Sequence, residues 1–291
     1  MTRSMTRSEF RFLDRLRVRW AEIDAQKIVF NGHYLMYFDT AVAGYWRALA
    51  MPYAQTMEQL GGDMYVRKAT LEYLASAAYD DVLHVGMRCA RIGNSSVLFS
   101  GAAFRQDQLL VSCELMYVFA DPHSQTSRPV PQALRDAFLG FEAGQDMVEV
   151  RLGSWAELGP DARAIRSEVF VQEQKIPAAL KWDEADAGCT HAVAYNRFGL
   201  PLATGRWVQQ APGVAKIGRM AVIAPLRSAA VGGQVLQALM RSAKASGNEQ
   251  VVLHAQTSAS AFYSRAGFMV RGQVFEEAGI AHVEMVRPLR D

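Results

Sequence analysis

A run of small residues in the second half of the chain has the composition of an anion-binding turn. Arg227-Ser228-Ala229-Ala230-Val231-Gly232-Gly233 follows the apolar run 217–222 and precedes the amphipathic run 234–245. That order predicts a strand, a turn and a helix. Small side chains let a phosphate approach the backbone, and the N–H groups and positive dipole of a helix start hold the anion. The pattern therefore predicts a ligand that carries a pyrophosphate.

An aspartate in the first half lies between a predicted strand and a predicted helix. Residues 12–20 alternate apolar and basic side chains, which predicts a half-buried strand. Its apolar side chains are Leu16, Val18 and Trp20. Asp24 follows, and Asn31 can cap a helix over about 32–50. This half contains no Ser-His-Asp set and no metal-ligand cluster that could serve as a catalytic group in place of Asp24.

The elements of the first half predict a sheet with a long helix packed on it. Strands are expected at 65–76, 82–92, 96–104 and 109–119, and a closing helix at 132–141. One long helix against antiparallel strands is an α+β layer. The short polar stretch 142–146 is the best candidate linker. We expect domains at 10–142 and 147–291, after a disordered or poorly ordered start at 1–9.

The second half predicts an α/β domain with a mixed sheet. Strands are expected at 147–152, 191–196, 200–208, 216–223, 250–255, 268–275 and 281–287. Helices are expected at 161–174, 229–246 and 259–266. Strands and helices in this order favour a sheet with helices on both faces. The predicted fold class of the whole chain is α+β.

Composition excludes several classes of protein. The chain has 291 residues and a formal net charge of +2, which is enough for two domains and too balanced to imply a nucleic acid or a membrane as partner. Cys89, Cys113 and Cys189 form no C-x-x-C pair, so we expect neither a disulfide framework nor a metal site. We expect no signal peptide at the start of this sequence, and it contains no apolar run of ~20 residues. We expect a cytoplasmic protein.

The small-residue turn and its surroundings resemble the GNAT acetyltransferase superfamily. The strand Lys216-Ile217-Gly218-Arg219-Met220-Ala221-Val222 leads into the turn, and Phe262-Tyr263-Ser264-Arg265-Ala266-Gly267-Phe268 follows it. The resemblance spans roughly 147–289 and is closest to the small ElaA/YjcF-type branch. Three segments carry that closer resemblance: 168–174, 182–186 and 276–282.

This resemblance implies acetyl-CoA as the bound cosubstrate, in a splay between strands ending near Val222 and starting near 251. The backbone of Met220 and Val222 would pair with the pantetheine amides. The turn from 227 to 233 would hold the pyrophosphate. Tyr263 would lie near the sulfur and protonate the leaving thiolate.

The group that deprotonates the amine acceptor stays open. Many GNAT enzymes have a carboxylate on the strand before the turn, where this chain has Arg219. Glu173, His254 or His282, or a water that they order, could serve, and His254 is the better titratable candidate near neutral pH. A loop of carboxylates could attract a cationic amine or simply be solvated. Its members are Asp183, Glu184 and Asp186.

Ala230 departs from the GNAT pattern, which has glycine at the first small position of the turn. If this residue has a helical φ, alanine costs little. If it needs a positive φ, alanine strains the turn by ~1 kcal/mol or more, and CoA binding should weaken.

Three blocks in the first half resemble the hotdog-fold acyl-CoA thioesterases of the 4-hydroxybenzoyl-CoA thioesterase (YbgC) family. The blocks are 17–24, 31–34 and 66–81. The resemblance spans roughly 10–140 and implies that Asp24 attacks the thioester or activates water. The helix start near 30–33 would hold the oxyanion. It also implies a homodimer or tetramer formed mainly by this half. We expect a second carboxylate, Asp39, to be structural.

This half also departs from the thioesterase pattern. Lys27 replaces a glycine three residues after the aspartate, and Asn31 stands where relatives often carry histidine. A lysine there could crowd the site or bind a CoA phosphate. Arg67, Lys68 and Arg128 could also contact phosphate, although surface cations are usually just solvated.

The sequence therefore predicts a bifunctional enzyme of CoA thioesters. The first half would hydrolyse an acyl-CoA, and the second would transfer an acetyl group from acetyl-CoA to an amine. The alternative is a CoA-binding sensor or assembly scaffold with one or both halves inactive, an interpretation that Lys27 and Ala230 motivate.

Overall fold

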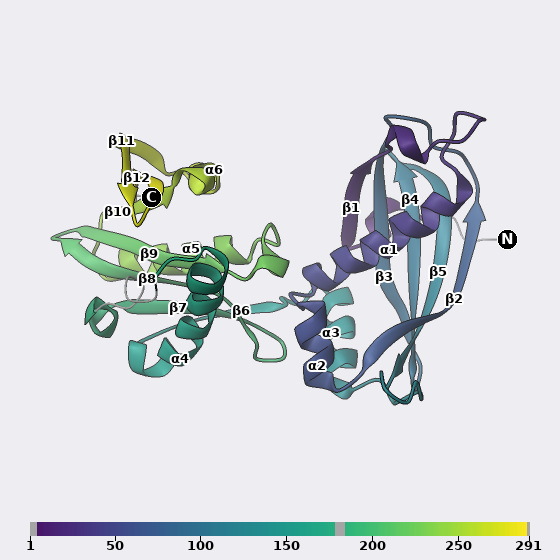
Figure 1. Ribbon diagram of the computed structural model, residues 1–291, viewed down its shortest axis with the longest axis horizontal. Coiled ribbons are helices and arrows are strands. Elements are labelled where there is room, and N and C mark those ends of the chain that lie inside the picture. Colours follow the sequence, from purple (N-terminus) through teal and green to yellow (C-terminus); the bar gives the residue numbers. More distant parts are fainter. Residues whose placement is uncertain (1–4, 178–183, 290–291) are drawn as a thin grey trace. The chain divides into compact units, whose positions relative to one another are not determined.

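A computed structural model of the chain describes residues 5–177 and 184–289. The chain divides into two compact units, Met1–Met147 and Val148–Asp291, which run from purple to teal and from teal to yellow in Figure 1. The first unit has an antiparallel sheet and the second a mixed one, each with helices packed on it. This architecture confirms the predicted α+β fold class.

The first unit is built on a five-stranded sheet in the order β1-β3-β4-β5-β2. Its strands are β1 (Phe12–Arg17), β2 (Asp63–Tyr73), β3 (Val82–Ile92), β4 (Ser96–Arg105) and β5 (Gln108–Ala120). Its helices are α1 (Asn31–Ala48), α2 (Tyr53–Leu60) and α3 (Gln132–Glu142). Strands β3, β4 and β5 pair in chain order, as hairpin turns require, and β1 and β2 form the two edges.

Helix α1 packs across this sheet (Figure 1). Its large buried side chains recur at intervals of three and four: Tyr34, Tyr37, Phe38, Val42, Tyr45 and Trp46. Each contributes roughly 1.5–3 kcal/mol when its apolar surface leaves water. Gly44 permits close approach to β1, because a Cβ there would lie 2.5 Å from Cζ of Phe12. This burial fixes the helix, and therefore the place of its N-terminus.

Trp20 does not lie on the buried face that the alternating pattern predicts. Strand β1 ends at Arg17, and the 3-10 turn η2 (Trp20–Glu22) begins with Trp20, 72% of whose surface is exposed. The last backbone bonds of this strand join Val18 to Asp80 and Asp81, just before β3, and the chain then turns into η2. A local pattern cannot show where a strand loses its partner.

Short elements and helix ends also differ from prediction. Helix α2 was not predicted, because eight residues carry too little periodicity. Residues 5–9, expected to be disordered, include the 3-10 turn η1 (Arg7–Glu9), where Thr6 N donates to the Glu9 carboxylate at 3.0 Å. Asn31 is the first residue of α1 and not its cap, since Phe30 takes the N-cap position.

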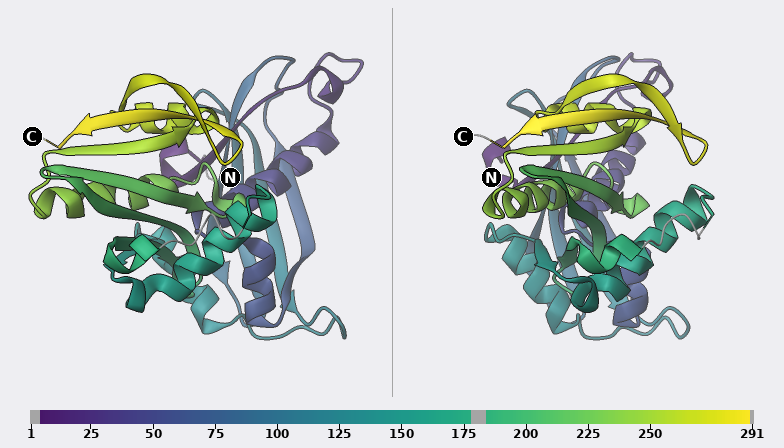
Figure 2. Two further views of the ribbon diagram at one scale, coloured as in Figure 1. Left: turned by 60° about the vertical axis from the view of Figure 1, so that its left-hand side comes forward. Right: turned by 90° about the vertical axis from the view of Figure 1, so that its left-hand side faces the viewer.

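The second unit contains a seven-stranded sheet in the order β11-β12-β10-β9-β8-β7-β6. Its strands are β6 (Val148–Gly153), β7 (Thr190–Asn196), β8 (Pro201–Ala211), β9 (Val214–Val222), β10 (Gln250–Gln256), β11 (Met269–Glu277) and β12 (Ile280–Pro288). Its α-helices are α4 (Trp155–Arg166), α5 (Val231–Ala245) and α6 (Ser260–Arg265). Figure 2 shows the yellow β11–β12 hairpin beside β10.

Strands β9 and β10 pair in parallel and then separate. Their register runs from Gln250 opposite Val214 to Leu253 opposite Ile217, and it stops there although both strands continue. Strands that diverge leave backbone N–H and C=O groups without ladder partners. The divergence lies where the GNAT resemblance implies a splay.

The helix predicted over 161–174 is two segments. Helix α4 ends at Arg166 and continues as the π-helix η3 (Ser167–Glu173). A π-helical turn widens the helix by one residue and redirects the side chains that follow it, and such turns are frequent at functional sites. Periodicity does not reveal a single inserted residue.

Two residues between β9 and α5 have a left-handed backbone although neither is glycine. Ser228 has φ 70° and Ala230 has φ 63°, and Ala230 is the N-cap of α5. An L-residue in this region costs roughly 1–2 kcal/mol, because its Cβ approaches the following carbonyl. Of the two cases that the sequence leaves open for Ala230, the structure shows the strained one.

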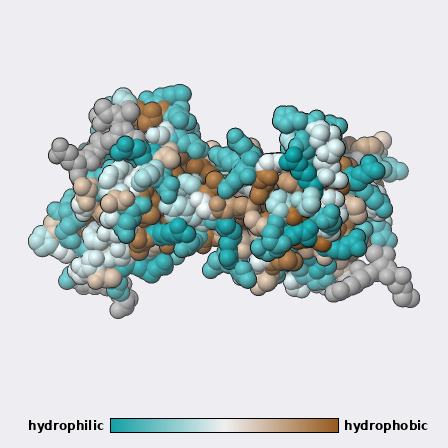
Figure 3. All heavy atoms as spheres, turned by 90° about the horizontal axis from the view of Figure 1, so that it is seen from below, coloured by the Kyte–Doolittle hydropathy of each residue, from teal (hydrophilic) through white to brown (hydrophobic). Residues whose placement is uncertain are grey.

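The surface carries both hydrophilic and apolar side chains. In the face drawn in Figure 3, hydrophilic residues are interspersed with apolar ones. Among the described residues, no helix is long and apolar enough to cross a bilayer. Several large apolar side chains are exposed on β2 and the loop after it: Tyr65, Val66, Tyr73, Leu74 and Tyr79.

Replacing Ala230 by glycine is expected to stabilise the second unit. Glycine adopts φ 63° without the Cβ penalty, so the free energy of unfolding should rise by about 1 kcal/mol, measured by urea or thermal unfolding. Ala229 is the matched control, because its φ is not in the left-handed region. Ala229→Gly should lower stability. A destabilising Ala230→Gly would contradict the strain at this position.

Candidate functional site

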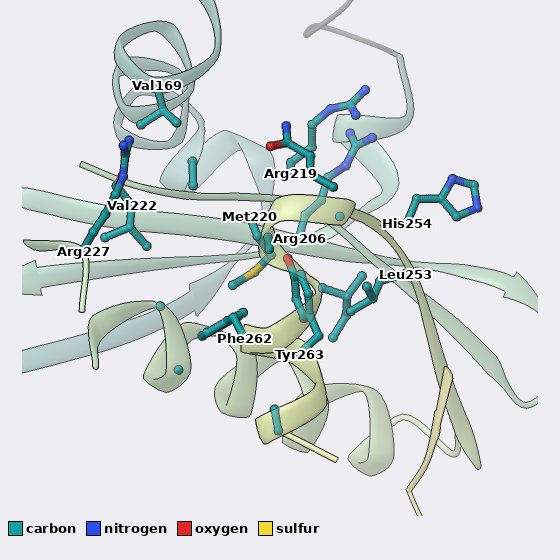
Figure 4. Close-up of a pocket in the computed structure, with 18 of the residues that line it drawn as sticks. Val169, Arg206, Arg219, Met220, Val222, Arg227, Leu253, His254, Phe262 and Tyr263 are labelled. Carbon is teal, nitrogen blue, oxygen red and sulfur yellow. The ribbon is translucent and has the colours of Figure 1, made fainter. Parts of the chain in front are cut away.

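A cavity of about 1180 Å³ lies in the second unit, where β9 and β10 diverge. Residues from η3, the end of β9 and the turn into α5 line it, together with residues from β10 and α6. In Figure 4, Arg227 and His254 lie on opposite sides of the cavity, with Tyr263 between them. The cavity is large enough to hold an extended cofactor.

The turn before α5 presents backbone amides to this cavity. Ser228, Ala230, Gly232 and Gly233 line it, whereas Val231 is buried in the core. The first N–H groups of a helix have no acceptor within the helix. Because the turn is built of small residues and the helix dipole is positive here, a phosphate can reach these N–H groups.

The carboxylate of Glu173 is already hydrogen-bonded, which does not suit a general base. Both oxygens of its carboxylate accept from Arg227, with Nη1 to Oε1 and Nη2 to Oε2 each at 2.6 Å. The Nε of Arg227 donates to the carbonyl of Val222 at 3.1 Å. The hydrogen bond from Arg227 holds the pKa of Glu173 below its ordinary value. A carboxylate held in this way is a poor acceptor for a proton from an amine.

Tyr263 lies on α6 and lines the cavity. Its ring packs against Phe262 and Phe268, at centroid distances of 4.9 and 6.0 Å. Burial raises the pKa of Tyr263 to about 12. The phenol therefore keeps its proton throughout the neutral and mildly alkaline range, which is the state that a proton donor requires.

His254 lies on β10 among charged side chains from neighbouring strands. Its Nδ1 is 3.3 Å from a carboxylate oxygen of Glu277, and its Nε2 is 3.9 Å from one of Glu284. Lys216 Nζ approaches both ring nitrogens at 3.5 Å. Burial acts to raise the pKa of Glu277, but the hydrogen bond from His254 and nearby positive charge keep it below its ordinary value. A carboxylate beside an imidazole can orient it for proton transfer.

His282 is the other histidine at the cavity. Its Nδ1 lies 2.8 Å from the carbonyl of Ile280, and its ring stacks on Phe275. Both rings pack against Phe275, but the Nδ1 of His254 faces the carboxylate of Glu277 whereas that of His282 faces a backbone carbonyl, so His254 has the partner that suits a base.

A β-bulge in β9 shapes the cavity wall. Thr204 pairs with Ala221 and Arg206 with Gly218, so two residues of β9 are opposite one residue of β8. One of them, Arg219, has φ 55°. A bulge redirects side chains, and Figure 4 shows the side chains of Arg206, Arg219, Met220 and Val222 at the cavity.

Asp186 is neither a solvated loop residue nor free to attract a cationic amine, so both interpretations offered for it are wrong. Its two carboxylate oxygens accept from Arg166 at 2.9 Å, and it also pairs with Arg206. His191 Nε2 lies 2.9 Å from its carbonyl. Arg166 is fully buried, and a buried charge needs such partners. Asp183 lies outside the described residues.

In the first unit, Asp24 opens a tight loop that leads into α1. Its carboxylate accepts from the N–H of Gln26 at 2.8 Å, and its own N–H donates to the carbonyl of Ile28 at 2.9 Å. An isolated bridge between Ile23 and Val29 closes the loop. Asp24 therefore caps a turn and stands half-buried, shortly before the helix start.

Glu22 is a residue that the sequence patterns did not single out. It is only 3% exposed, and its carboxylate accepts from the Tyr37 hydroxyl at 2.7 Å and from Arg19 N at 2.8 Å. Its carbonyl accepts from Phe30 N at 2.9 Å. Glu22 thus ties the beginning of the Asp24 loop to its end and to α1. An acidic residue two positions after an exposed tryptophan gives no sequence signal of burial.

Lys27 has φ 63° and is exposed. This is the left-handed conformation that a glycine adopts without strain, which explains the glycine of the thioesterase pattern at this position. At the start of α1, His33 N donates to Phe30 O at 2.9 Å. Within the described chain, the amides of Asn31 and Gly32 donate to no other backbone group, so they are available to an oxyanion.

The other charged candidates of this unit lie on its surface. Arg67 and Lys68 are exposed on the edge strand β2. Arg128 forms an ion pair with Asp121, which gives it a structural role. Asp39 is exposed and accepts a long hydrogen bond of 3.4 Å from a buried tyrosine.

Two family models match the chain. The model of the thioesterase-like superfamily matches residues 18–138, and that of the acetyltransferase (GNAT) domain matches residues 160–289. Together they confirm both resemblances seen in the sequence.

Relatives of both kinds are similar to parts of the chain. The uncharacterized N-acetyltransferase YjcF of Bacillus subtilis is 38% identical over 128 residues, or 44% of this chain and 90% of that protein. A putative esterase of Aquifex aeolicus is 32% identical over 96 residues, or 33% of this chain and 74% of that protein. The acyl-CoA thioesterase YbgC of Haemophilus influenzae is 23% identical over 123 residues, or 42% of this chain and 90% of that protein. The chain therefore belongs to the thioesterase-like superfamily through its first unit and to the GNAT acetyltransferases through its second.

Proposed function

We propose that the chain is a bifunctional enzyme of CoA thioesters. Its second unit transfers an acetyl group from acetyl-CoA to an amine, and its first unit hydrolyses an acyl-CoA. The observation that carries the proposal is the cavity at the divergence of β9 and β10, lined by an amide-rich helix start and by a protonated tyrosine. The two family matches support the same reaction classes.

In the proposed transfer, the pyrophosphate of CoA binds the amides at the start of α5, and the pantetheine arm lies along the edge of β9 at Met220 and Val222, where β10 no longer pairs with it. The amine nitrogen attacks the acetyl carbonyl carbon, a C–N bond forms, and the C–S bond breaks. Tyr263 gives its proton to the departing thiolate and regains one from solvent. The phenol carries its proton before the C–S bond breaks and delivers it to the sulfur, so CoA leaves as a thiol.

We assign the deprotonation of the amine to His254. It lines the same cavity as Tyr263 and has a carboxylate partner in Glu277. We do not assign this role to Glu173, because both of its carboxylate oxygens bond Arg227. The amine proton passes to the imidazole as the C–N bond forms, and Glu277 stabilises the imidazolium.

In the proposed hydrolysis, the Asp24 carboxylate activates water toward the thioester carbonyl or attacks it directly, and the amides of Asn31 and Gly32 hold the oxyanion. The name of the Haemophilus relative, an acyl-CoA thioesterase, supports this reaction. Glu22 keeps the loop and the helix start in one arrangement through its bonds to both.

We also propose that the first unit forms a homodimer, or a tetramer built from it, through the edge strand β2. This strand has eleven residues and a free edge, and its exposed apolar side chains include Tyr65 and Val66. Long apolar edges of this kind pair with another strand.

Asp24→Asn should lower the release of free thiol from acyl-CoA substrates by about 100-fold or more, since it removes the group that activates water. Thiol release from a panel of acyl-CoA chain lengths measures this. The matched control is Asp39→Asn, which should keep the rate within about two-fold. If no acyl-CoA is hydrolysed by the unaltered chain, a CoA-binding sensor or scaffold is the better account.

Tyr263→Phe should lower kcat for amine acetylation about 10- to 100-fold and leave KM for acetyl-CoA nearly unchanged, because the ring still packs while the proton donor is gone. Amine-dependent release of CoA measures this. Tyr195→Phe is the control, because Tyr195 bonds Asp161 at 2.6 Å and is not among the residues that line the cavity. An unchanged kcat in Tyr263→Phe would exclude this role.

His254→Gln should lower kcat/KM for the amine about 10- to 100-fold at neutral pH, and the loss should shrink as the pH rises, because the amine then loses its proton to solvent. The measurement is a pH profile of acetyl transfer. His282→Gln should have little effect. An equal loss for the glutamine variants at the two positions, or a loss independent of pH, would speak against His254 as the base.

A further inference from the structure

We propose that Glu173 is a positioning residue of the CoA site, which holds the pyrophosphate-binding turn in shape through Arg227. This inference rests on the proposed function of the second unit. It replaces the expectation that Glu173 is a base, and it gives a reason for the π-helix that ends at this residue.

The contact between Glu173 and Arg227 is a two-pronged ion pair. Each terminal nitrogen of the guanidinium donates to its own carboxylate oxygen at 2.6 Å, while Nε donates to the Val222 carbonyl at 3.1 Å. Paired hydrogen bonds of this kind fix orientation as well as distance. Each of the three guanidinium nitrogens makes one of these hydrogen bonds, so its plane is fixed between the end of β9 and η3.

The turn that follows Arg227 needs such support. Ser228 and Ala230 both have a left-handed backbone, which an alanine or serine does not favour in isolation. Inside the turn, Ala229 N donates to Leu226 O at 3.2 Å. Since the backbone preferences of these residues oppose the observed shape, contacts from outside the turn must hold it.

The π-helix places the carboxylate of Glu173 within hydrogen-bond distance of Arg227. Val169 and Phe170 of η3 are buried and line the cavity. Figure 4 shows Val169 and Arg227 on the same side of the cavity. Gln174 N donates to Val169 O at 3.1 Å, the long i to i+5 step that ends the π-helix. One segment thus supplies both an apolar wall and the carboxylate that anchors the turn.

The charges suit a structural role. The mutual hydrogen bond raises the pKa of Arg227 and lowers the pKa of Glu173, so both are ionised near neutral pH. The pair is neutral overall, which leaves the amides and the dipole of α5 as the groups that attract the pyrophosphate. Affinity for CoA should then depend on the shape of the turn more than on the charge of Arg227.

Two variants distinguish an effect of the shape of the turn on CoA binding from an effect of the charge beside it. Glu173→Gln and Arg227→Gln both break the ion pair, but the first leaves an unpaired positive charge beside the turn and the second an unpaired negative one. If Glu173 positions the turn, Glu173→Gln weakens CoA binding about three- to ten-fold despite the added positive charge. If the pair acts only through charge, Glu173→Gln binds CoA more tightly than the unaltered chain.

The measurement is calorimetric titration of the full chain with CoA, together with steady-state kinetics with acetyl-CoA. We expect Glu173→Gln to raise KM for acetyl-CoA by the same factor as Kd, with kcat within about two-fold. Glu149→Gln is the matched control, because it removes a comparable exposed pair with Arg151 at 2.8 Å on β6 and should change neither constant.

A rescue completes the test. Ala230→Gly in the Glu173→Gln background should recover part of the affinity, since glycine adopts the left-handed conformation without an external anchor. Tighter or unchanged CoA binding in Glu173→Gln would overturn the positioning role while leaving the proposed transfer intact. A loss in kcat alone would assign Glu173 to the chemistry instead. Failure of the unaltered chain to bind CoA would overturn the proposed function and this inference together.

Discussion

The early end of the pairing between β9 and β10 is the constraint on which the second unit depends. The strands share a ladder only as far as Leu253 and Ile217. Beyond that point the two strands diverge, and their ends line the cavity together with η3, the turn into α5 and α6. The turn into α5 and the tyrosine of α6 then flank the same opening, because each follows one of the two separating strands. The β-bulge at Arg219 adds to the divergence by twisting β9 away.

Both units hold a loop in a conformation that its residues do not favour. Lys27 and Ala230 both have φ 63°, a conformation that glycine adopts without strain. In each case a carboxylate outside the strained residue anchors the loop: that of Glu22 accepts from Tyr37, and that of Glu173 accepts from Arg227. The backbone carbonyl of Glu22 also accepts from Phe30 N. Departures from glycine therefore do not by themselves imply a lost site. They imply that contacts with neighbouring residues hold a backbone conformation that glycine would adopt without such support.

The long, strongly patterned elements were predictable from the sequence, and contacts between distant residues were not. Helix α1 and strands β3 to β5 follow hydrophobic periodicity, and the α5 turn follows composition. The sign of φ at Ala230, the π-helix and the short helix α2 depend on packing that no local pattern encodes. The same holds for buried charge. Asp186 belongs to a polar run in the sequence, yet it lies with Arg166 in the core because a partner 20 residues away meets it there.

A crystal structure of the full chain with acetyl-CoA tests the central claim most directly. The account predicts density for the pyrophosphate on the amides from Ala230 to Gly233, with the sulfur within about 4 Å of the Tyr263 hydroxyl, a hydrogen-bond approach to sulfur. It also predicts that the contact between Glu173 and Arg227 persists when the ligand is bound. Density for the ligand elsewhere, or a cavity that stays closed at saturating acetyl-CoA, would contradict the account.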